Sequence, residues 1–264
     1  MLGFEQSREA RSATDMLRTD GVKTMLTEKD IAAEIQTNSG GTVVFTGAGM
    51  STDSGLPDFR SKDGLWKNVD PMELATASAM RGDYDRFHAF YSHRFEQMRD
   101  AHPNAGHRIL ADWERRGFVD CVVTQNVDGL HTAAGSKKIY ELHGSVGSVR
   151  CMECGRPATQ EDFIARKPCA RCGGKLRPGV VLFGEGLPED ALDASWEAAE
   201  NAKVFIVLGS SLQVSPANQL PQVAKRAGAL LAICNRDATP LDRIADYRTG
   251  TGIADFLKEL DALL

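Results

Sequence analysis

The sequence predicts an α/β protein in which helices cover both faces of a parallel sheet. Short apolar runs alternate with segments of helical periodicity along most of the chain. The apolar runs are nearly continuous, as they are in strands that are buried on both faces of a sheet. A length of 264 residues suffices for one large domain, or for a large domain with an insert.

The order of the expected elements supports this fold class. Thr27-Glu28-Lys29-Asp30 is typical of a helix N-cap followed by acids in the first turn, so we expect a helix from there to about Gln36. The other elements that we expect are strands at 42–46, 119–124, 139–142, 203–208 and 229–234, and helices at 83–100, 105–116, 190–201, 217–227 and 253–264.

Two segments interrupt the alternation of strands and helices. Residues 61–104 predict a helical module, and residues 145–177 are irregular and carry four of the six cysteines. We expect these two modules to form a smaller domain, with a ligand cleft at the carboxyl ends of the strands. The larger domain is expected to comprise residues 27–60, 105–144 and 178–264, preceded by an N-terminal extension at 1–26 to which we assign no function.

Composition and charge exclude several classes of protein. The net charge is −5, which does not favour broad binding to nucleic acid or to an anionic membrane. No apolar run approaches the ~20 residues that cross a bilayer. The charged and polar residues at 1–26 lack the apolar stretch of a secretory signal. We therefore expect a cytoplasmic monomer.

Four clustered cysteines have the spacing of a zinc ribbon. Cys151 and Cys154 form one C-x-x-C pair, and Cys169 and Cys172 form a second pair after fourteen residues. Disulfides are disfavoured in the cytoplasm, and two paired motifs are far more specific than a single redox C-x-x-C. Four sulfur ligands leave no open position for water, so we expect one structural Zn²⁺ per chain.

The strand expected at 42–46 leads into a glycine-rich turn. Backbone N–H groups in such a turn bind pyrophosphate. The glycines at 47, 49 and 55 do not match the G-x-G-x-x-G spacing of dehydrogenases, because the third comes too late. The turn continues into Pro57-Asp58-Phe59-Arg60, which adds an acid, an aromatic ring and a cation. The segment therefore predicts a dinucleotide site without hydride transfer.

Polar residues follow the other expected strands at the same sheet edge. Gln125, Asn126 and Asp128 follow the second strand, and either bind a ligand or form a hydrogen-bonded turn with Asp128 as a helix cap. His143 follows the third strand and is either a core histidine or a general base, of which the base is favoured. The remaining candidates are Gly209, Ser210 and Ser211 after the fourth strand, and Asn235 and Asp237 after the fifth.

For the other histidines and the remaining two cysteines, the sequence does not predict a ligand-binding or catalytic role. His88, His93, His102, His107 and His131 are expected to be structural. Cys121 and Cys234 are expected in the core.

Taken together, these motifs resemble those of the sirtuins of bacterial type, a family of NAD-dependent protein deacylases. The resemblance covers residues 42–264 approximately and keeps the family's motif order. The segments that carry it are GAGMSTDSGLPDFR (47–60), TQNVDGLH (124–131), ELHG (141–144), the two C-x-x-C pairs, RPGVVLFGE (177–185), GSSLQVSP (209–216) and CNRD (234–237).

The resemblance implies a Rossmann-like large domain, a small domain with a zinc ribbon, and a cleft that takes NAD and an acyl-lysine peptide. His143 would be the base, and Asn126 and Asp128 would orient NAD. The substrate backbone would pair with Val181, Phe183, Gly184 and Glu185 as an added strand. NAD would bind at Gly47, Ala48, Gly49, Ser51, Thr52, Asp58, Phe59, Arg60, Gln125, Asn126, Asp128, Gly209, Ser210, Ser211, Asn235, Asp237 and Ile253.

The resemblance also implies a deacetylase reaction that consumes NAD. The acyl oxygen attacks C1′ of the nicotinamide ribose as nicotinamide leaves. His143 deprotonates the ribose hydroxyls so that one attacks the acyl carbon, and water completes the release of lysine and O-acyl-ADP-ribose. Phe59 would shield the reactive carbon from water.

Three alternatives remain open at this level. Tyr91 and Arg94 resemble the Tyr-x-x-Arg pair of sirtuins that act on succinyl- or malonyl-lysine, although Thr52 and Asp58 depart from that subgroup. Mono-ADP-ribosyl transfer needs the same NAD site. A non-catalytic NAD-binding adaptor is disfavoured, because such a module has no need of His143.

Overall fold

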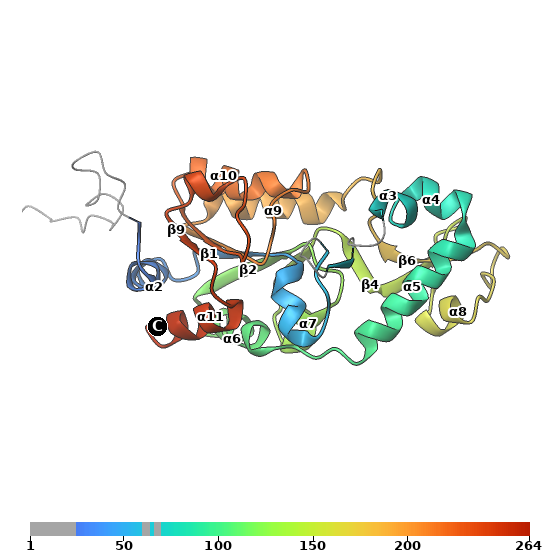
Figure 1. Ribbon diagram of the computed structural model, residues 1–264, viewed down its shortest axis with the longest axis horizontal. Helices are drawn as coiled ribbons and strands as arrows, with labels where there is room; N and C mark the ends of the chain where they lie inside the picture. The colour runs from blue at the N-terminus through green and yellow to red at the C-terminus, as the bar shows by residue number, and fades with distance from the viewer. Residues whose placement is uncertain (1–24, 60–63, 66–69) are drawn as a thin grey trace, which may run out of the picture.

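The structure is a computed structural model that describes residues 25–59, 64–65 and 70–264 (Figure 1). Its centre is a six-stranded parallel sheet with the strand order β3-β2-β1-β7-β8-β9. The strands are β1 (Thr42–Thr46), β2 (Val119–Thr124), β3 (Ile139–Glu141), β7 (Val204–Leu208), β8 (Leu230–Cys234) and β9 (Tyr247–Thr249). This arrangement confirms the predicted fold class.

Five of these strands match the sequence prediction to within one residue at each end. The edge strand β9 was missed. It has only three residues, two of them half-buried, which is too short for an apolar run to stand out.

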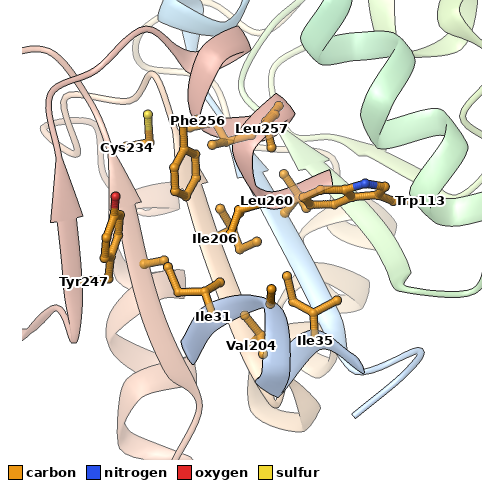
Figure 2. Packing of buried hydrophobic residues seen from close by; sticks show 14 of the residues in the cluster. Ile31, Ile35, Trp113, Val204, Ile206, Cys234, Tyr247, Phe256, Leu257 and Leu260 are labelled. Atoms are coloured by element: carbon orange, nitrogen blue, oxygen red, sulfur yellow. The ribbon is translucent and has the colours of Figure 1, made fainter. Parts of the chain in front are cut away.

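Apolar side chains alternate between the two faces of the sheet. In β7, Val204, Ile206 and Leu208 belong to one buried cluster, whereas Phe205 and Val207 belong to another. The first cluster lies under α2 (Glu28–Thr37), α6 (Ala105–Arg115) and α11 (Ile253–Asp261). Figure 2 shows how Trp113 and Phe256 from two of these helices reach toward Ile206 of the sheet.

The opposite face of the sheet is covered by α9 (Glu189–Asn201) and α10 (Leu220–Arg226). The helix expected at 217–227 begins as a separate turn of 3₁₀-helix, η3 (Ala217–Gln219). Pro221 lies in the first turn of α10, where its missing N–H costs nothing. Cys121 and Cys234 are both fully buried in the core, as predicted.

A smaller unit lies beside the carboxyl ends of the strands (Figure 1). One part is helical, with α3 (Pro71–Leu74), α4 (Ala77–Gly82) and α5 (Tyr84–Arg99). The other part is a three-stranded antiparallel sheet of order β5-β4-β6, together with α8 (Gln160–Ile164). Its strands are β4 (Gly144–Cys151), β5 (Pro157–Ala158) and β6 (Leu176–Val180).

The prediction that residues 145–177 are irregular was therefore wrong. The pairing of β4 with β6 shifts register between Ser145 and Val149, and this irregularity hides the two-residue period of a strand. Phe87 and Phe95 of α5 pack with Val149 and Phe163 in one buried cluster, which joins the two parts of the smaller unit. The domain boundaries themselves stay a prediction.

Short elements complete the chain within the described ranges. They are η1 (Ala48–Ser54), α7 (Leu130–Ala134) and η4 (Asp242–Ile244). A search of the described helices found none with the length and apolar character that crossing a bilayer requires.

Candidate active site and zinc centre

A cavity of about 630 Å³ opens where the parallel strands end. Its size is typical of a site for a small molecule or cofactor. Arg60 lies outside the described residues. Every other residue that was predicted to bind NAD or substrate lines this cavity: Gly47, Ala48, Gly49, Ser51, Thr52, Asp58, Phe59, Tyr91, Arg94, Gln125, Asn126, Asp128, His143, Val181, Phe183, Gly184, Glu185, Gly209, Ser210, Ser211, Asn235, Asp237 and Ile253.

The glycines of the first loop are required by a contact between two loops. A Cβ atom on Gly49 would lie 2.7 Å from Cα of Gly209, and one on Gly47 would lie 2.7 Å from its carbonyl oxygen. Gly209 itself has φ +63° and would place a Cβ 2.5 Å from the nitrogen of Met50. From the sequence, the glycine-rich turn was predicted to expose backbone N–H groups to a pyrophosphate. The structure adds that these glycines let the loops after β1 and β7 pack backbone against backbone.

Asn126 and Asp128 are linked to the same loop by side-chain hydrogen bonds. Asn126 Nδ2 donates to the carbonyl of Gly47 at 3.0 Å and contacts Ser51 Oγ at 3.2 Å. Ser51 Oγ donates to Asp128 Oδ2 at 2.7 Å, and Asp128 Oδ1 accepts from the backbone N–H of Leu130. The N-cap of α7 is Gly129, so Asp128 is not the helix cap but forms a hydrogen-bonded turn before the helix, and it also lines the cavity. The structure is compatible with both roles considered for Asp128, a hydrogen-bonded turn and the binding of a ligand.

His143 is held with one ring nitrogen available to the cavity. Its Nδ1 lies 3.0 Å from the carbonyl oxygen of Gln125, and only a protonated nitrogen can donate to that oxygen. The neutral ring then carries its lone pair on Nε2, for which the described residues provide no hydrogen-bond partner. Burial lowers the pKa of His143, and the bond to Gln125 offsets part of that shift. The imidazole is therefore a neutral base at pH 7.

The next residue, Gly144, permits this placement. It has φ +68°, and a Cβ there would lie 2.1 Å from the carbonyl oxygen of Gly179. Gly144 pairs with Val180 at the start of β4, so the chain turns directly from His143 into the antiparallel sheet. The smaller unit is thereby anchored next to the base.

The remaining strand-end residues join neighbouring loops. Gln125 Nε2 donates to Ser210 Oγ at 2.8 Å, which connects the loop after β2 to the loop after β7. Asn235 Nδ2 donates to the carbonyl of Asp237 at 2.8 Å and shapes the loop after β8. Ile253 lies at the first turn of α11.

Tyr91 and Arg94 lie one turn apart on α5 and are both buried at the cavity wall. Arg94 is only 6% exposed, and its guanidinium lies 5.9 Å from the ring centroid of Phe59. Its hydrogen bond goes to the neutral Gln97, and it forms no ion pair with a carboxylate of the described residues. Burial lowers the pKa of Arg94, with Tyr91 and Asp128 acting in the opposite direction. A buried cation without an anionic partner is costly, which favours an anionic ligand.

The segment predicted to bind the substrate backbone already makes several bonds within the chain. Val181 N–H donates to the carbonyl of His143, and Phe183 pairs through both backbone groups with Ala75 and Ala77. Both backbone groups of Gly184 lack a partner among the described residues. They remain available to an added strand.

The carboxylate of Glu185 stabilises the shape of this segment. It pairs with Arg177 at 2.5 Å and accepts the N–H of Leu182 at 2.9 Å. Arg177 is buried and also donates to the carbonyl of Val180 at 2.8 Å. The pair therefore fixes the shape of residues 180–185, a role of Arg177 that sequence reasoning missed.

Other cavity residues were also missed. Among them are the segment 213–216 after the Gly-Ser-Ser turn, Arg236, Leu187, Leu192 and the segment 250–252. The last of these directly follows β9. The other loops were predicted by taking the residues that follow a buried strand. The same rule would have predicted residues 250–252 if β9 had been recognised.

The four clustered cysteines converge as predicted. Their sulfur atoms all lie within 4.8 Å of one another, with Cys151 to Cys172 at 3.5 Å and Cys154 to Cys169 at 3.7 Å. Sulfurs around a tetrahedral Zn²⁺ are about 3.8 Å apart when each Zn–S bond is about 2.3 Å. The backbone N–H groups of Glu153 and Arg171 donate to the sulfur atoms of Cys151 and Cys169. The donor set fits a closed zinc site.

The family and its relatives agree with this geometry. The profile of the Sir2 family matches residues 47–216. The chain is 56% identical over 206 residues to "NAD-dependent protein deacetylase 1" of Geobacillus kaustophilus, covering 78% of this chain and 85% of that protein. It is 44% identical to the "NAD-dependent protein deacylase" of Aquifex aeolicus, covering 82% and 95% of the two chains.

Solved structures of Sir2 proteins are also similar to this chain. A Sir2 structure with a deacetylated p53 peptide and 3′-O-acetyl-ADP-ribose superposes with a TM-score of 0.85 at 36% identity, covering 90% of this chain and 98% of that one. A Sir2 structure with a p53 peptide and NAD⁺ superposes with a TM-score of 0.82 at the same identity and coverage. Because the family profile covers more than half of its length and one of its relatives is 56% identical, the chain belongs to the Sir2 family.

Proposed function

We propose that the protein is an NAD-dependent protein-lysine deacetylase, which transfers the acetyl group from lysine to ADP-ribose and releases nicotinamide. The observation that carries this proposal is His143, a neutral imidazole with a free Nε2 in a cavity lined by strand-end loops. The names of the relatives, and the NAD⁺ and acetyl-ADP-ribose in related structures, support it. We place it in the cytoplasm, which its free thiols favour.

Different parts of the cavity would bind the two substrates, NAD and the acetyl-lysine peptide. Residues after β1, β2, β7 and β8 would hold NAD, which supplies the ribose carbon that accepts the acetyl oxygen. Asn126 and Asp128 would orient the nicotinamide ribose, and Phe59 would exclude water. The acetyl-lysine peptide would enter from the side of the smaller unit and pair with the free backbone groups of Gly184.

His143 would accept the proton of a ribose hydroxyl at Nε2. Its bond to the Gln125 carbonyl fixes the tautomer and stabilises the positive charge that forms on the ring. Catalysis then needs no nucleophilic side chain, in agreement with the lack of a catalytic triad among the described cavity residues.

The variant His143→Ala is expected to lower kcat for deacetylation by about 10²–10⁴-fold, because the general base is lost. The test incubates the protein with NAD and an acetyl-lysine peptide and quantifies nicotinamide, free peptide and O-acetyl-ADP-ribose by mass spectrometry. His102→Ala, at an exposed position outside the cavity, is the control and should match the wild type. Near-normal turnover in a folded His143→Ala would contradict the assignment. ADP-ribose attached to protein would instead favour mono-ADP-ribosyl transfer.

The acid limb of the pH profile should lie below the ordinary histidine value. Burial lowers the pKa of His143 from 6.5, and the reaction requires the unprotonated ring. Activity is therefore retained as pH falls through 6.5 and is lost only at more acidic pH. We expect this in kcat/KM for NAD measured between pH 5 and 8. A midpoint above 6.5 would show that His143 is not the titrating base or that its environment raises its pKa.

A second activity, on succinyl- or malonyl-lysine, is favoured by Arg94. This cation is buried at the cavity wall beside Tyr91 without a carboxylate partner among the described residues, and an acidic acyl group would supply one. Tyr91 would then donate its hydroxyl to the same carboxylate.

We expect the wild type to act on a succinyl peptide as well as on the acetyl version of the same peptide. Arg94→Met keeps the length of the side chain but removes its charge. It should lower kcat/KM for the succinyl peptide at least about tenfold more than for the acetyl peptide. Equal effects on both peptides, or no succinyl turnover by the wild type, would end this second proposal.

We also propose that the four cysteines hold one structural Zn²⁺ away from the chemistry. Cys151→Ser should reduce the metal content and lower the thermal midpoint by about 10 °C or more, because the binding free energy of such a site stabilises the folded state. Metal analysis and thermal unfolding measure both effects. Cys234→Ala, also at a buried thiol, is the matched control and should keep one zinc per chain. Full metal content in a folded Cys151→Ser would contradict the assignment.

A further inference from the structure

Two histidines that were expected to be structural lie together behind the cavity. His107 of α6 is fully buried, and His131 of α7 is only 3% exposed. Their rings meet edge to face, with centroids 4.7 Å apart. Neither residue lines the cavity. Each has one buried ring nitrogen without a hydrogen-bond partner among the described residues, Nε2 of His107 and Nδ1 of His131.

The bonds that the rings do make assign their protons. Nδ1 of His107 accepts the N–H of Asn104 at 3.3 Å, so the proton of the neutral ring is on Nε2. The Thr46 hydroxyl donates to Thr124 Oγ1 at 2.8 Å, which leaves Thr46 Oγ1 to accept from His131. Nε2 of His131, 3.0 Å away, therefore carries the proton, and its Nδ1 carries a lone pair.

The two unpartnered nitrogens are thus a donor and an acceptor on rings in contact. Both rings are neutral at pH 7, since burial lowers the pKa of His107 to about 4 and that of His131 to about 3. Asp128 raises and Arg108 lowers the pKa of His107, but neither outweighs burial.

This pair is connected to the loop that carries Asn126. Thr124 Oγ1, which accepts from Thr46, also accepts the backbone N–H of Asn126 at 3.0 Å. A chain of hydrogen bonds therefore runs from His131 through two threonines to the backbone of a cavity residue.

A second connection reaches the loop after β1. Asn104 caps α6 in a reciprocal capping box with His107, and Asn104 Nδ2 donates to the carbonyl of Met50 at 2.8 Å. Met50 precedes Ser51, which bonds both Asn126 and Asp128. His131 is thus linked through Thr46 and Thr124 to the backbone of Asn126, and His107 is linked through Asn104 to the loop that carries Ser51.

We propose that His107 and His131 form a pair of packed rings that positions Asn126 for NAD, His131 acting through Thr46 and Thr124 and His107 through Asn104. The inference rests on the proposed function, because it assigns Asn126 to the NAD site. The two histidines are positioning residues, since they lie outside the cavity and touch no reacting group.

Strand β1 supplies a matched test. Thr46 and Thr42 are both fully buried, but only the Thr46 hydroxyl belongs to the chain, whereas Thr42 Oγ1 has no partner among the described residues. Thr46→Val should raise KM for NAD and lower kcat/KM for NAD about tenfold, with KM for the peptide unchanged. Thr42→Val should stay within about twofold of the wild type in all three parameters. Equal behaviour of the two variants would overturn the inference.

His131 gives a second comparison. A Gln side chain places an amide nitrogen near the position of Nε2 and can still donate to Thr46, whereas Asn is too short. His131→Gln should therefore retain several-fold more kcat/KM for NAD than His131→Asn. The double variant Thr46→Val/His131→Asn should be no worse than the worse single variant, because both break the same chain. Additive losses would contradict the coupling.

Nitrogen-15 spectra of the wild-type imidazoles test the pair without any variant. Both rings should be neutral Nε2–H tautomers at pH 7, and a proton on Nδ1 of His131 would overturn the assignment. The outcomes separate the two proposals. If the wild type does not consume NAD, the proposed function fails. If it does, and Thr46→Val matches Thr42→Val, only the positioning role fails.

Discussion

The backbone contact between the loops after β1 and β7 is the constraint on which the site depends. Gly47, Gly49 and Gly209 approach so closely that any side chain would meet backbone atoms below 3 Å. This contact holds η1 across the carboxyl edge of the sheet. Ser51 can then reach Asn126 and Asp128, and Gln125 can reach Ser210. The cavity is thus formed by loops bonded to one another, which keeps its geometry preorganised.

The smaller unit completes the cavity and brings different chemistry to it. The antiparallel sheet begins directly after His143, and α5 contributes Tyr91 and Arg94. The loops after the parallel strands contribute mainly neutral and acidic side chains to the cavity, while α5 contributes a buried cation. The zinc cluster lies at the other end of β4, where Cys151 ends the strand.

The parallel sheet was predictable because its strands are buried on both faces, so that five apolar runs stand out from the chain. Part of the cavity was predictable because parallel strands end at one edge, so that polar residues after these strands lie near one another. Other cavity residues, such as Tyr91, Arg94 and Gly184, were predicted only from the family resemblance. The small sheet was not predictable from its pattern. Its strand β4 contains Gly147 and a shift of register against β6. In the parallel sheet, β9 was also not predictable, because it is too short to show periodicity.

The sequence by itself determined the order of five strands of the parallel sheet, the four clustered cysteines and many of the residues that line the cavity, because each depends on local spacing, on the residue that follows a strand or on a family motif. Only the tertiary structure decided how those residues are used. The loop contact at Gly209, the support of Glu185 by Arg177 and the meeting of His107 with His131 all join distant segments. No local pattern encodes such contacts, because they arise when helices and loops pack against a sheet that forms only in the folded chain.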